Sequence, residues 1–427
     1  MVHYIKGSRA ILLICMISTV FALDLQGQQE GSKIETITFE GTEKSDNNYL
    51  IQFCHSKIGD YSSDSLLRED VQRLKNIPSV GDANYVFDTL SETLVFQIEE
   101  TKTLLPIANF GGVKGNNWFQ LGFYDSNWRG KGSFLSVIYQ NTNMQHGGQI
   151  YYRVPRIGRS DWGFSATLNR QASLEPLFFD EGIVNYIYTN HEVGLTAIKT
   201  FDFGDQLEFG ATYFIENYVK TQSLLSDNLA PSALTQPKYL SKVEYSSNKL
   251  NYNFFYLKGF YWKVALQNVY TIADQSWFQS LQFCGKHFIP AGKNGNFAMR
   301  LTAGLATNND SPFAPYVVDS HDNLRGVGSR TARGTAQFFV NLEYRHTIHE
   351  TKEWGVQTVT FLDFGTWRRP GGSLENFFGP SQFKQFLGGG LRLIYKKFHG
   401  AVLRIDYGVN VQNVLQRGAV LGFGQYF

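Results

Sequence analysis

Alternation of apolar and polar residues, in stretches of about ten residues, is the feature of this chain that most constrains its fold. The stretches recur from residue 104 to residue 427 and are separated by Gly, Asn, Asp and Ser. Examples are WFQLGFYDSN at 118–127, GSFLSVIYQN at 132–141, YNFFYLKGFYWK at 252–263 and AQFFVNLEYRH at 336–346. Because successive side chains of a strand point to opposite faces, this period predicts strands with one apolar and one polar face.

A transmembrane β-barrel explains these strands better than a soluble fold does. No segment of the region is long and apolar enough for a spanning helix, and the mean hydropathy is −0.24. A barrel produces that combination because its strands alternate between lipid and a polar lumen. At roughly 20 residues per strand and turn, residues 105–427 hold roughly 16 antiparallel strands. A soluble β-sandwich or propeller is the alternative, but aromatic residues near the strand ends favour the membrane barrel.

The N-terminus predicts a secretory signal peptide over residues 1–22. Two basic residues precede an apolar run from Ile11 to Leu23, which is shorter than the roughly 20 residues of a spanning helix. A permanent anchor is therefore disfavoured. A lipoprotein signal at Cys15 is disfavoured too, because the preceding Ile14 is bulky.

Residues 33–104 predict a small α+β domain in front of the barrel. A short alternating strand at 34–39 precedes a helix with Leu50, Phe53 and Cys54 on one side. A second helix follows Ser62 or Ser63, and strands near 85–88 and 94–98 close the unit. Cys54 is interpreted as a small buried residue. With Cys284 as the only other cysteine after cleavage, no disulfide framework is expected.

Charge and motifs indicate neither a nucleic-acid partner nor an enzyme. The formal net charge is +2. The sequence has no Gly-x-Ser-x-Gly, P-loop or His-Glu-x-x-His motif. His321 and Asp322 lie near Arg325, but two neighbouring residues make neither a triad nor a metal site. We therefore expect no catalytic residue, cofactor or metal, although outer-membrane barrels with enzyme activity keep that alternative open.

One charged stretch, DNLRGVGSR at 322–330, interrupts the apolar pattern. It contains Leu324, Arg325 and Gly326. Two later strand segments carry carboxylates: VNLEYRH contains Glu343, and FLDFGTW contains Phe361, Asp363 and Gly365. A solvated surface loop with scattered charge is the alternative interpretation of this stretch.

The chain resembles the POTRA-plus-barrel superfamily of outer-membrane assembly factors and polypeptide transporters, the BamA, TamA and Sam-type proteins. The strand-helix-helix-strand-strand order is similar to one POTRA domain, and YDSNWRGKGSFLSVIYQ is similar to the family's first hairpin region. LRGVG at 324–328 resembles the arginine-glycine motif of the family's sixth extracellular loop, with Val327 where an aromatic is usual. FLDFG resembles its Phe-x-Asp-x-Gly pattern.

The resemblance implies that Arg325 binds Glu343 and Asp363 inside the barrel. A guanidinium can hold carboxylates of two adjacent strands at once, and this would fix the loop in the lumen. Gly326 would let the backbone turn beside the wall. The neighbouring Arg330 and Arg333 have no such partners in the family motif, so they are expected to matter less.

The first and last barrel strands predict a lateral seam. Pro106, Gly111 and Gly112 lie in the candidate first strand, LLPIANFGG, and weaken its hydrogen-bond ladder. Three glycines of the last strand have the same effect: Gly418, Gly422 and Gly424. An edge of this kind offers unpaired backbone groups to an incoming strand.

The C-terminal segment GAVLGFGQYF resembles the signal by which bacterial outer-membrane barrels are recognised for insertion. Its apolar residues are expected to share one strand face: Ala419, Leu421, Phe423 and Phe427. Gln425 stands where the family usually has an apolar residue.

From the resemblance we expect a factor that inserts client barrels into the outer membrane of a Gram-negative bacterium, with its POTRA domain in the periplasm. The expected partners are unfolded client polypeptides and the lipid bilayer, and accessory periplasmic proteins or lipoproteins are left open. A two-partner secretion transporter is the first alternative. Secretion transporters carry two POTRA domains and a plug helix, for which the N-terminal segment leaves little room. A passive pore is the second alternative.

Overall fold

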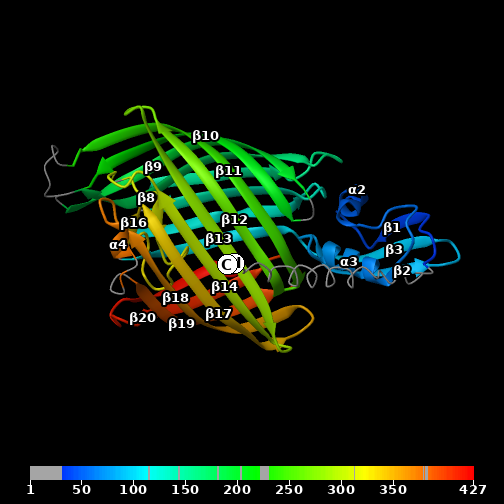
Figure 1. Ribbon diagram of the computed structural model, residues 1–427. Coiled ribbons are helices and arrows are strands. Elements are labelled where there is room, and N and C mark those ends of the chain that lie inside the picture. Colours follow the sequence, from blue (N-terminus) through cyan, green and yellow to red (C-terminus); the bar gives the residue numbers. More distant parts are fainter. Residues whose placement is uncertain are drawn as a thin grey trace, which may run out of the picture.

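The computed structural model describes residues 31–427, except 114–115, 143–144, 180–181, 202–203, 222–229, 312, 378 and 380–382. The predicted signal peptide, with Cys15, lies outside the described residues. A small N-terminal unit lies beyond one end of a large barrel (Figure 1). We call this end of the barrel the proximal end.

The N-terminal unit is an α+β unit with its own core. It comprises β1 (Thr36–Glu40), α2 (Asn47–Leu50), the 3₁₀ turn η1 (Ile51–Phe53), α3 (Asp64–Lys75), β2 (Val80–Asp88) and β3 (Thr93–Glu100). The sheet order is β1-β3-β2, with β1 parallel to β3 and β2 antiparallel to it. Its buried apolar side chains include Ile34, Leu50, Leu67, Leu74, Leu94 and Phe96.

The first helix of this unit is shorter than the sequence pattern predicts. It ends at Leu50 and continues only as η1, after which Cys54 is extended. The carboxylate of Asp70 in α3 accepts hydrogen bonds from the backbone N–H groups of His55 and Ser56, at 2.6 and 3.0 Å. These bonds hold residues 55 and 56 against α3. The helix therefore ends earlier than the spacing of its apolar residues predicts.

The prediction of about sixteen antiparallel strands is confirmed. One sixteen-stranded sheet curls into a nearly closed barrel with all of its pairs antiparallel. The strands are β4 (Leu104–Val113), β5 (Asn116–Trp128), β6 (Ser133–Thr142), β7 (Gln145–Val154), β8 (Trp162–Phe179), β9 (Gly182–Thr200), β10 (Asp205–Lys220), β11 (Ala233–Asn253), β12 (Tyr256–Thr271), β13 (Ser276–Ala291), β14 (Gly295–Ala306), β17 (Ala336–Glu350), β18 (Trp354–Arg368), β19 (Lys384–Tyr395), β20 (Val402–Asn410) and β21 (Arg417–Phe423).

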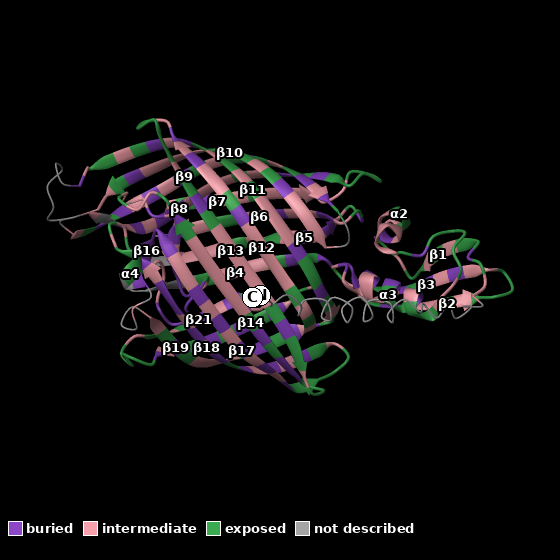
Figure 2. Cartoon of the chain, viewed as in Figure 1, coloured by how far each residue is buried: buried purple, intermediate pink, exposed green. Residues whose placement is uncertain are grey.

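Alternation along the strands puts apolar side chains outside and charged side chains inside. In β20, Leu403, Ile405 and Tyr407 are exposed, whereas Arg404 and Asp406 are buried. Figure 2 shows bands of buried, intermediate and exposed residues along the barrel strands. Exposed Leu, Ile, Val, Phe, Tyr and Trp recur on the outer face around the barrel. An outer surface of this extent suits contact with hydrocarbon and not with water.

Strand length varies more than the sequence pattern predicts. Strands β8 to β13 have 16 to 21 residues, whereas β21 has 7. About 9 to 11 residues suffice to cross a bilayer. The longer strands therefore extend past the outer apolar band.

The connection between β14 and β17, residues 307–335, lies inside the barrel, and we call it the lumenal loop. It contains a two-stranded sheet of β15 (Tyr316–Val318) and β16 (Ala332–Gly334). Its Leu324 and Val327 are buried with Phe339 of β17 and Phe386 of β19. The helix α4 (Leu374–Phe377) lies between β18 and β19. Among the described residues, no helix is long and apolar enough to cross a membrane.

Candidate functional site

Arg325 lies at the centre of the lumenal loop, and its side chain has no exposed surface. Its Nε and NH2 groups donate to the two carboxylate oxygens of Asp363 in β18, both at 2.8 Å. Its NH1 group donates to Glu343 in β17. The backbone N–H of Arg325 also donates to Asp363, at 3.1 Å. The structure thus brings together the arginine and both carboxylates that the resemblance implied.

Two aromatic rings cover the faces of the same guanidinium. The Arg325 Cζ atom lies 3.6 Å from the ring centroid of Phe361 and 4.1 Å from that of Tyr426. Carboxylates in the plane and rings above and below satisfy an arginine by charge, hydrogen bonding and cation–π attraction together. Phe361 was a predicted site residue. Tyr426 was not, because it follows the last strand and nothing near it in sequence points to Arg325.

Further buried charges surround Arg325. Arg345 donates to Glu343 at 2.8 Å, and Arg392 donates to both oxygens of Asp406, at 2.7 and 3.1 Å. Asp406 lies 3.8 Å from Arg325. With Asp363, the cluster contains three arginines and three carboxylates, all without exposed side-chain surface. The equal number of positive and negative groups matters, because one buried charge without a partner destabilises the folded state by several kcal/mol.

Glycines let the lumenal loop approach the barrel wall. Gly326 has a φ of +94°, and a Cβ atom there would meet the backbone of Gly408 in β20. A Cβ atom on Gly408 would in turn meet the carbonyl of Arg325. Gly365, a predicted residue, makes room for the ring of Phe339. Gly408 was not predicted, because only the packing of loop on strand distinguishes it from other strand glycines.

A second anchor binds the lumenal loop to the opposite wall, and this corrects an expectation. Arg330 and Arg333 both bind Glu175 of β8; the bond from Arg333 Nε is 3.0 Å long, and the Glu175 side chain has no exposed surface. Counted from β4, β8 is the fifth strand and β18 the thirteenth, so the two are eight positions apart in the sixteen-stranded sheet. The family motif nominated no partner for Arg330 or Arg333, and the structure gives both of them Glu175. The pairing joins residues more than 150 positions apart, so local sequence carries no signal of it.

The C-terminal segment does not continue β21 as predicted. The strand ends at Phe423, and Gly424 has a φ of +81°, after which the chain turns inward. Phe427 packs against Phe288 and receives a hydrogen bond from Arg345 at its backbone carbonyl, 3.1 Å away. Phe427 therefore does not share a strand face with Ala419, Leu421 and Phe423, although the sequence pattern predicted that it would. The positive φ of Gly424, which side chains disfavour, breaks the two-residue period.

Five of the six predicted seam residues lie on the two strands that end the sheet. Pro106, Gly111 and Gly112 are in β4, Gly418 and Gly422 are in β21, and Gly424 follows β21. Among the described residues, no backbone ladder joins β4 to β21. The backbone N–H of Phe423 donates to the side chain of Asn109 at 3.3 Å. Every other pair of neighbouring strands in the barrel has a ladder, so this is its weakest junction.

The N-terminal unit is bonded to the proximal end of the barrel. Lys44 and Asp125 of β5 form an ion pair at 2.7 Å, and Asp125 also accepts a hydrogen bond from Thr103 at 2.6 Å. Tyr252, near the end of β11, donates its backbone N–H to the side chain of Asn76 at 2.9 Å. Lys102 donates its backbone N–H to the carbonyl of Lys397 in the β19–β20 turn, also at 2.9 Å. Asp125 lies in the predicted hairpin region, but its role in this attachment was not foreseen.

Comparison with known proteins identifies the fold only. No protein-family model matches the chain, and no curated protein sequence does. Among solved structures, BamA from Haemophilus ducreyi lacking POTRA domains 1–3 aligns with a TM-score of 0.55 and 13% identity, over 92% of this chain and 84% of that one. CdiB from Acinetobacter baumannii gives 0.54 and 13%, over 92% and 74%. CdiB from Escherichia coli gives 0.58 and 10%, over 92% and 77%. The chain has the fold of the BamA and CdiB barrels.

This likeness supports the barrel fold that the resemblance implied. It establishes neither a single POTRA domain nor an activity. It covers 92% of this chain. The identities are far too low to transfer an activity. Within the described residues, no group of three His, Cys, Asp or Glu side chains is placed to hold a metal ion.

Proposed function

We propose that this protein inserts client β-strands into the outer membrane of a Gram-negative bacterium at the seam between β4 and β21. The observation that carries the proposal is the missing ladder between these strands, where the Phe423–Asn109 hydrogen bond links them. The backbone groups of an unpaired edge can template an incoming strand. In this proposal the N-terminal unit is a single POTRA domain in the periplasm, and the proximal end of the barrel is its periplasmic end.

A polypeptide-secretion transporter is the second candidate, because two of the reported structural neighbours are CdiB proteins. Secretion through the lumen would require the lumenal loop to leave it. The loop is held at β17 and β18 by Arg325 and at β8 by Arg330 and Arg333. Both anchors would have to break, whereas insertion at the seam requires neither to break. This difference favours insertion.

A reversible crosslink tests the seam. The variant carries Phe110→Cys and Phe423→Cys, whose side chains are both exposed on the outer faces of β4 and β21, in a background with Cys54→Ala and Cys284→Ala. We expect oxidation to abolish assembly of outer-membrane barrels and reductant to restore it, because strand insertion requires the seam to open. Client assembly is measured as the amount of several folded barrels in the outer membrane after depletion of the wild-type protein.

The matched control joins two strands that are already paired. Ile405→Cys and Leu421→Cys lie opposite one another in the β20–β21 ladder, so oxidation should leave client assembly intact. Equal assembly by the oxidised and reduced seam variant would refute insertion at the seam. Loss of one secreted protein, with all barrels at normal levels, would identify the protein as a transporter instead.

A further inference from the structure

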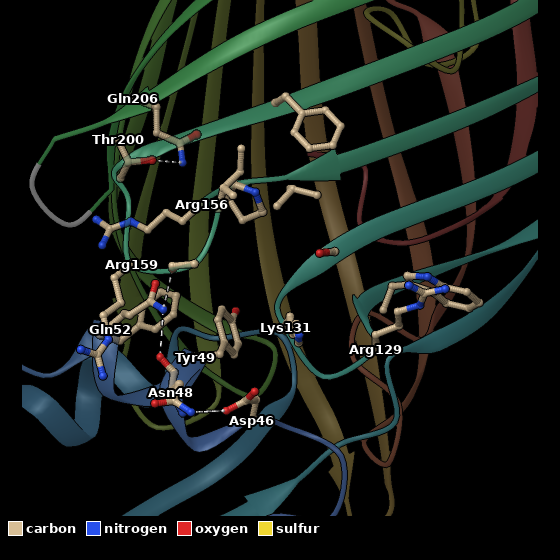
Figure 3. A pocket seen from close by; sticks show the side chains of 18 of the residues that line it. Asp46, Asn48, Tyr49, Gln52, Arg129, Lys131, Arg156, Arg159, Thr200 and Gln206 are labelled. Atoms are coloured by element: carbon tan, nitrogen blue, oxygen red, sulfur yellow. Dashed lines mark hydrogen bonds between the residues drawn. The ribbon is translucent and has the colours of Figure 1, made fainter.

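A cavity of about 770 Å³ lies between the N-terminal unit and the proximal rim of the barrel. Helix α2 and η1 form one wall, and the turns after β5 and β7 form the other (Figure 3). Figure 3 shows Tyr49 and Gln52 on the side of the unit, with Arg156 and Arg159 facing them from the β7–β8 turn. The insertion function proposed above makes no use of this cavity.

The charge of the cavity lining is strongly positive. Four cations line it: Arg129, Lys131, Arg156 and Arg159. Among the described residues that line it, Asp46 is the single acidic one, and its carboxylate already accepts the backbone N–H of Asn48 at 2.8 Å. Arg156 is 3.9 Å from Asp161, and the other three cations form no ion pair with a described residue. This concentration of positive charge fits an anionic ligand.

Close packing holds the two cation-bearing turns in place. A Cβ atom on Gly130 would meet the backbone of Lys44, and one on Gly132 would meet the ring of Tyr49. Between β5 and β6, Arg129 has a φ of +59°, which few side chains adopt. The side chain of Gln52 donates to the carbonyl of Gly158 in the other turn, at 3.2 Å. The cations are thus placed by the docking of the unit on the rim.

The outer side of the same cavity is aromatic and faces the outside of the barrel. Phe164 lines the cavity and is 39% exposed, on the outer face of β8. Trp162, two residues before it on the same face, is 47% exposed, and the ammonium of Lys199 lies 5.4 Å from its ring centroid. Aromatic and basic side chains in this order mark the level where hydrocarbon meets lipid headgroups.

We propose that this cavity binds the phosphate headgroup of an anionic phospholipid from the periplasmic leaflet, whose acyl chains lie on the outer face at Trp162 and Phe164. Arginine side chains match phosphate oxygens in geometry as well as charge. The lipid bridges the N-terminal unit and the barrel rim. The inference rests on the proposed membrane orientation, but it does not depend on insertion at the seam. An acidic client segment would lack contacts for the outward aromatic residues, so the lipid is favoured.

The test measures lipid retention by the full-length protein. The variant replaces all four cavity cations by Gln: Arg129→Gln, Lys131→Gln, Arg156→Gln and Arg159→Gln. The control variant replaces four exposed cations outside the cavity: Lys33→Gln, Lys57→Gln, Lys293→Gln and Lys352→Gln. Each protein is reconstituted into phosphatidylcholine vesicles with or without phosphatidylglycerol and re-extracted into detergent, and native mass spectrometry counts the bound phosphatidylglycerol.

We expect the wild type and the control variant to retain phosphatidylglycerol and the cavity variant to bind it at least about tenfold more weakly, because each of the four cations near an anionic lipid surface contributes about fivefold. Heat-modifiable gel migration establishes that each variant is folded. If the cavity variant is not folded, the Arg156→Gln/Arg159→Gln pair replaces it.

Equal retention by all three proteins would overturn the proposal. Displacement of the lipid by millimolar inorganic phosphate would reduce the site to a free-phosphate site. Binding of an acidic peptide by the lipid-free wild type but not by the cavity variant, with lipid retention unchanged, would assign the cavity to clients. The crosslink at the seam has a separate readout, so failure of either proposal is distinguishable from failure of the other.

Discussion

Arg325 carries more interactions than any single motif in the sequence suggests. It binds Asp363 through three hydrogen bonds, binds Glu343 through one, and lies between the rings of Phe361 and Tyr426. A planar guanidinium is the side chain that can make all of these contacts together, because its donors lie in one plane and its faces remain free. The lumenal loop therefore depends on this residue for its orientation as well as its position.

Replacing Arg325 should free the loop without unfolding the barrel. Arg325→Ala leaves Asp363 and Glu343 buried and less well paired, which costs about 3 to 5 kcal/mol of loop stability. Arg325→Lys should rescue poorly, because an ammonium cannot span both carboxylates. Protease cleavage within residues 307–335 measures the effect, with the exposed Arg159→Ala as control. In a double-mutant cycle with Asp363→Asn, purely additive effects would show that the two residues do not interact.

The second anchor predicts a distinct local effect. Glu175→Gln removes the shared carboxylate of Arg330 and Arg333 but leaves the Arg325 contacts intact. We expect proteolysis of the loop near residues 328–335 to increase, and Arg330→Ala with Arg333→Ala to add little once Glu175 is replaced. Limited proteolysis with mass mapping locates the cleavage. Full protection of this part of the loop in Glu175→Gln would contradict a structural role for the anchor.

At the scale of elements, the C-terminal segment connects the seam to the lumenal loop. Strand β21 forms one side of the seam, and Tyr426, three residues after its end, covers Arg325 and donates to the carbonyl of Ser320 at 3.2 Å. Gln425 accepts at its carbonyl from Arg404, at 2.8 Å, and at its side chain from Arg392, at 3.1 Å. Movement of β21 away from β4 therefore strains contacts that also hold the loop.

This connection can be tested at Tyr426. Tyr426→Ala removes the ring over the buried guanidinium, a cation–π contact worth about 2 kcal/mol when desolvated. We expect the variant to increase both protease cleavage of the lumenal loop and exposure of a cysteine placed at Asn109. Tyr426→Phe keeps the ring and should behave nearly as the wild type. If the alanine variant loosens the loop but leaves the seam cysteine protected, the two elements are not coupled.

At the scale of the whole molecule, the N-terminal unit and the barrel form one docked assembly. Lys44 and Ser45 donate their backbone N–H groups to Glu100 at 2.9 and 2.8 Å, while the Lys44 ammonium reaches Asp125. Burial acts to raise the pKa of Glu100, but the hydrogen bonds from Ser45 and Lys44 outweigh it and lower that pKa. Burial also lowers the pKa of His399, in the turn that contacts Lys102, to about 4.

The His399 shift predicts that acid loosens the docking, and the Glu100 shift predicts that acid weakens the segment of the unit that carries Lys44. His399 stays neutral in the docked state, so docking is unaffected above pH of about 6.5 and weakens as the pH falls from there to about 4. The stabilisation from Glu100 is present above its ordinary pKa and is lost as the pH falls through its lowered value. Protease release of a fragment ending near residue 103 should therefore rise on acidification. His399→Gln should remove the part of the increase in fragment release that occurs above pH 4. If fragment release by this variant depends on pH as it does in the wild type, the role of His399 is refuted.

The barrel as a whole should behave as a folded membrane protein. Unboiled samples should migrate faster on gels than boiled ones, because closed membrane barrels resist unfolding by detergent. Recovery of the intact protein in the soluble fraction would contradict the placement of the barrel in a membrane.

The sequence by itself determined the number and type of the barrel strands, because the two-residue period follows directly from strand geometry and needs no distant contact. It also pointed to Arg325, Glu343 and Asp363, whose residue types and order match a known motif. What only the tertiary structure decided is which distant groups meet: Glu175 with Arg333, Tyr426 with Arg325, and Lys44 with Asp125. These contacts depend on barrel closure, the inward turn at Gly424 and docking of the unit. Each sets distances between residues far apart in the chain, which no local pattern of apolar and polar residues encodes.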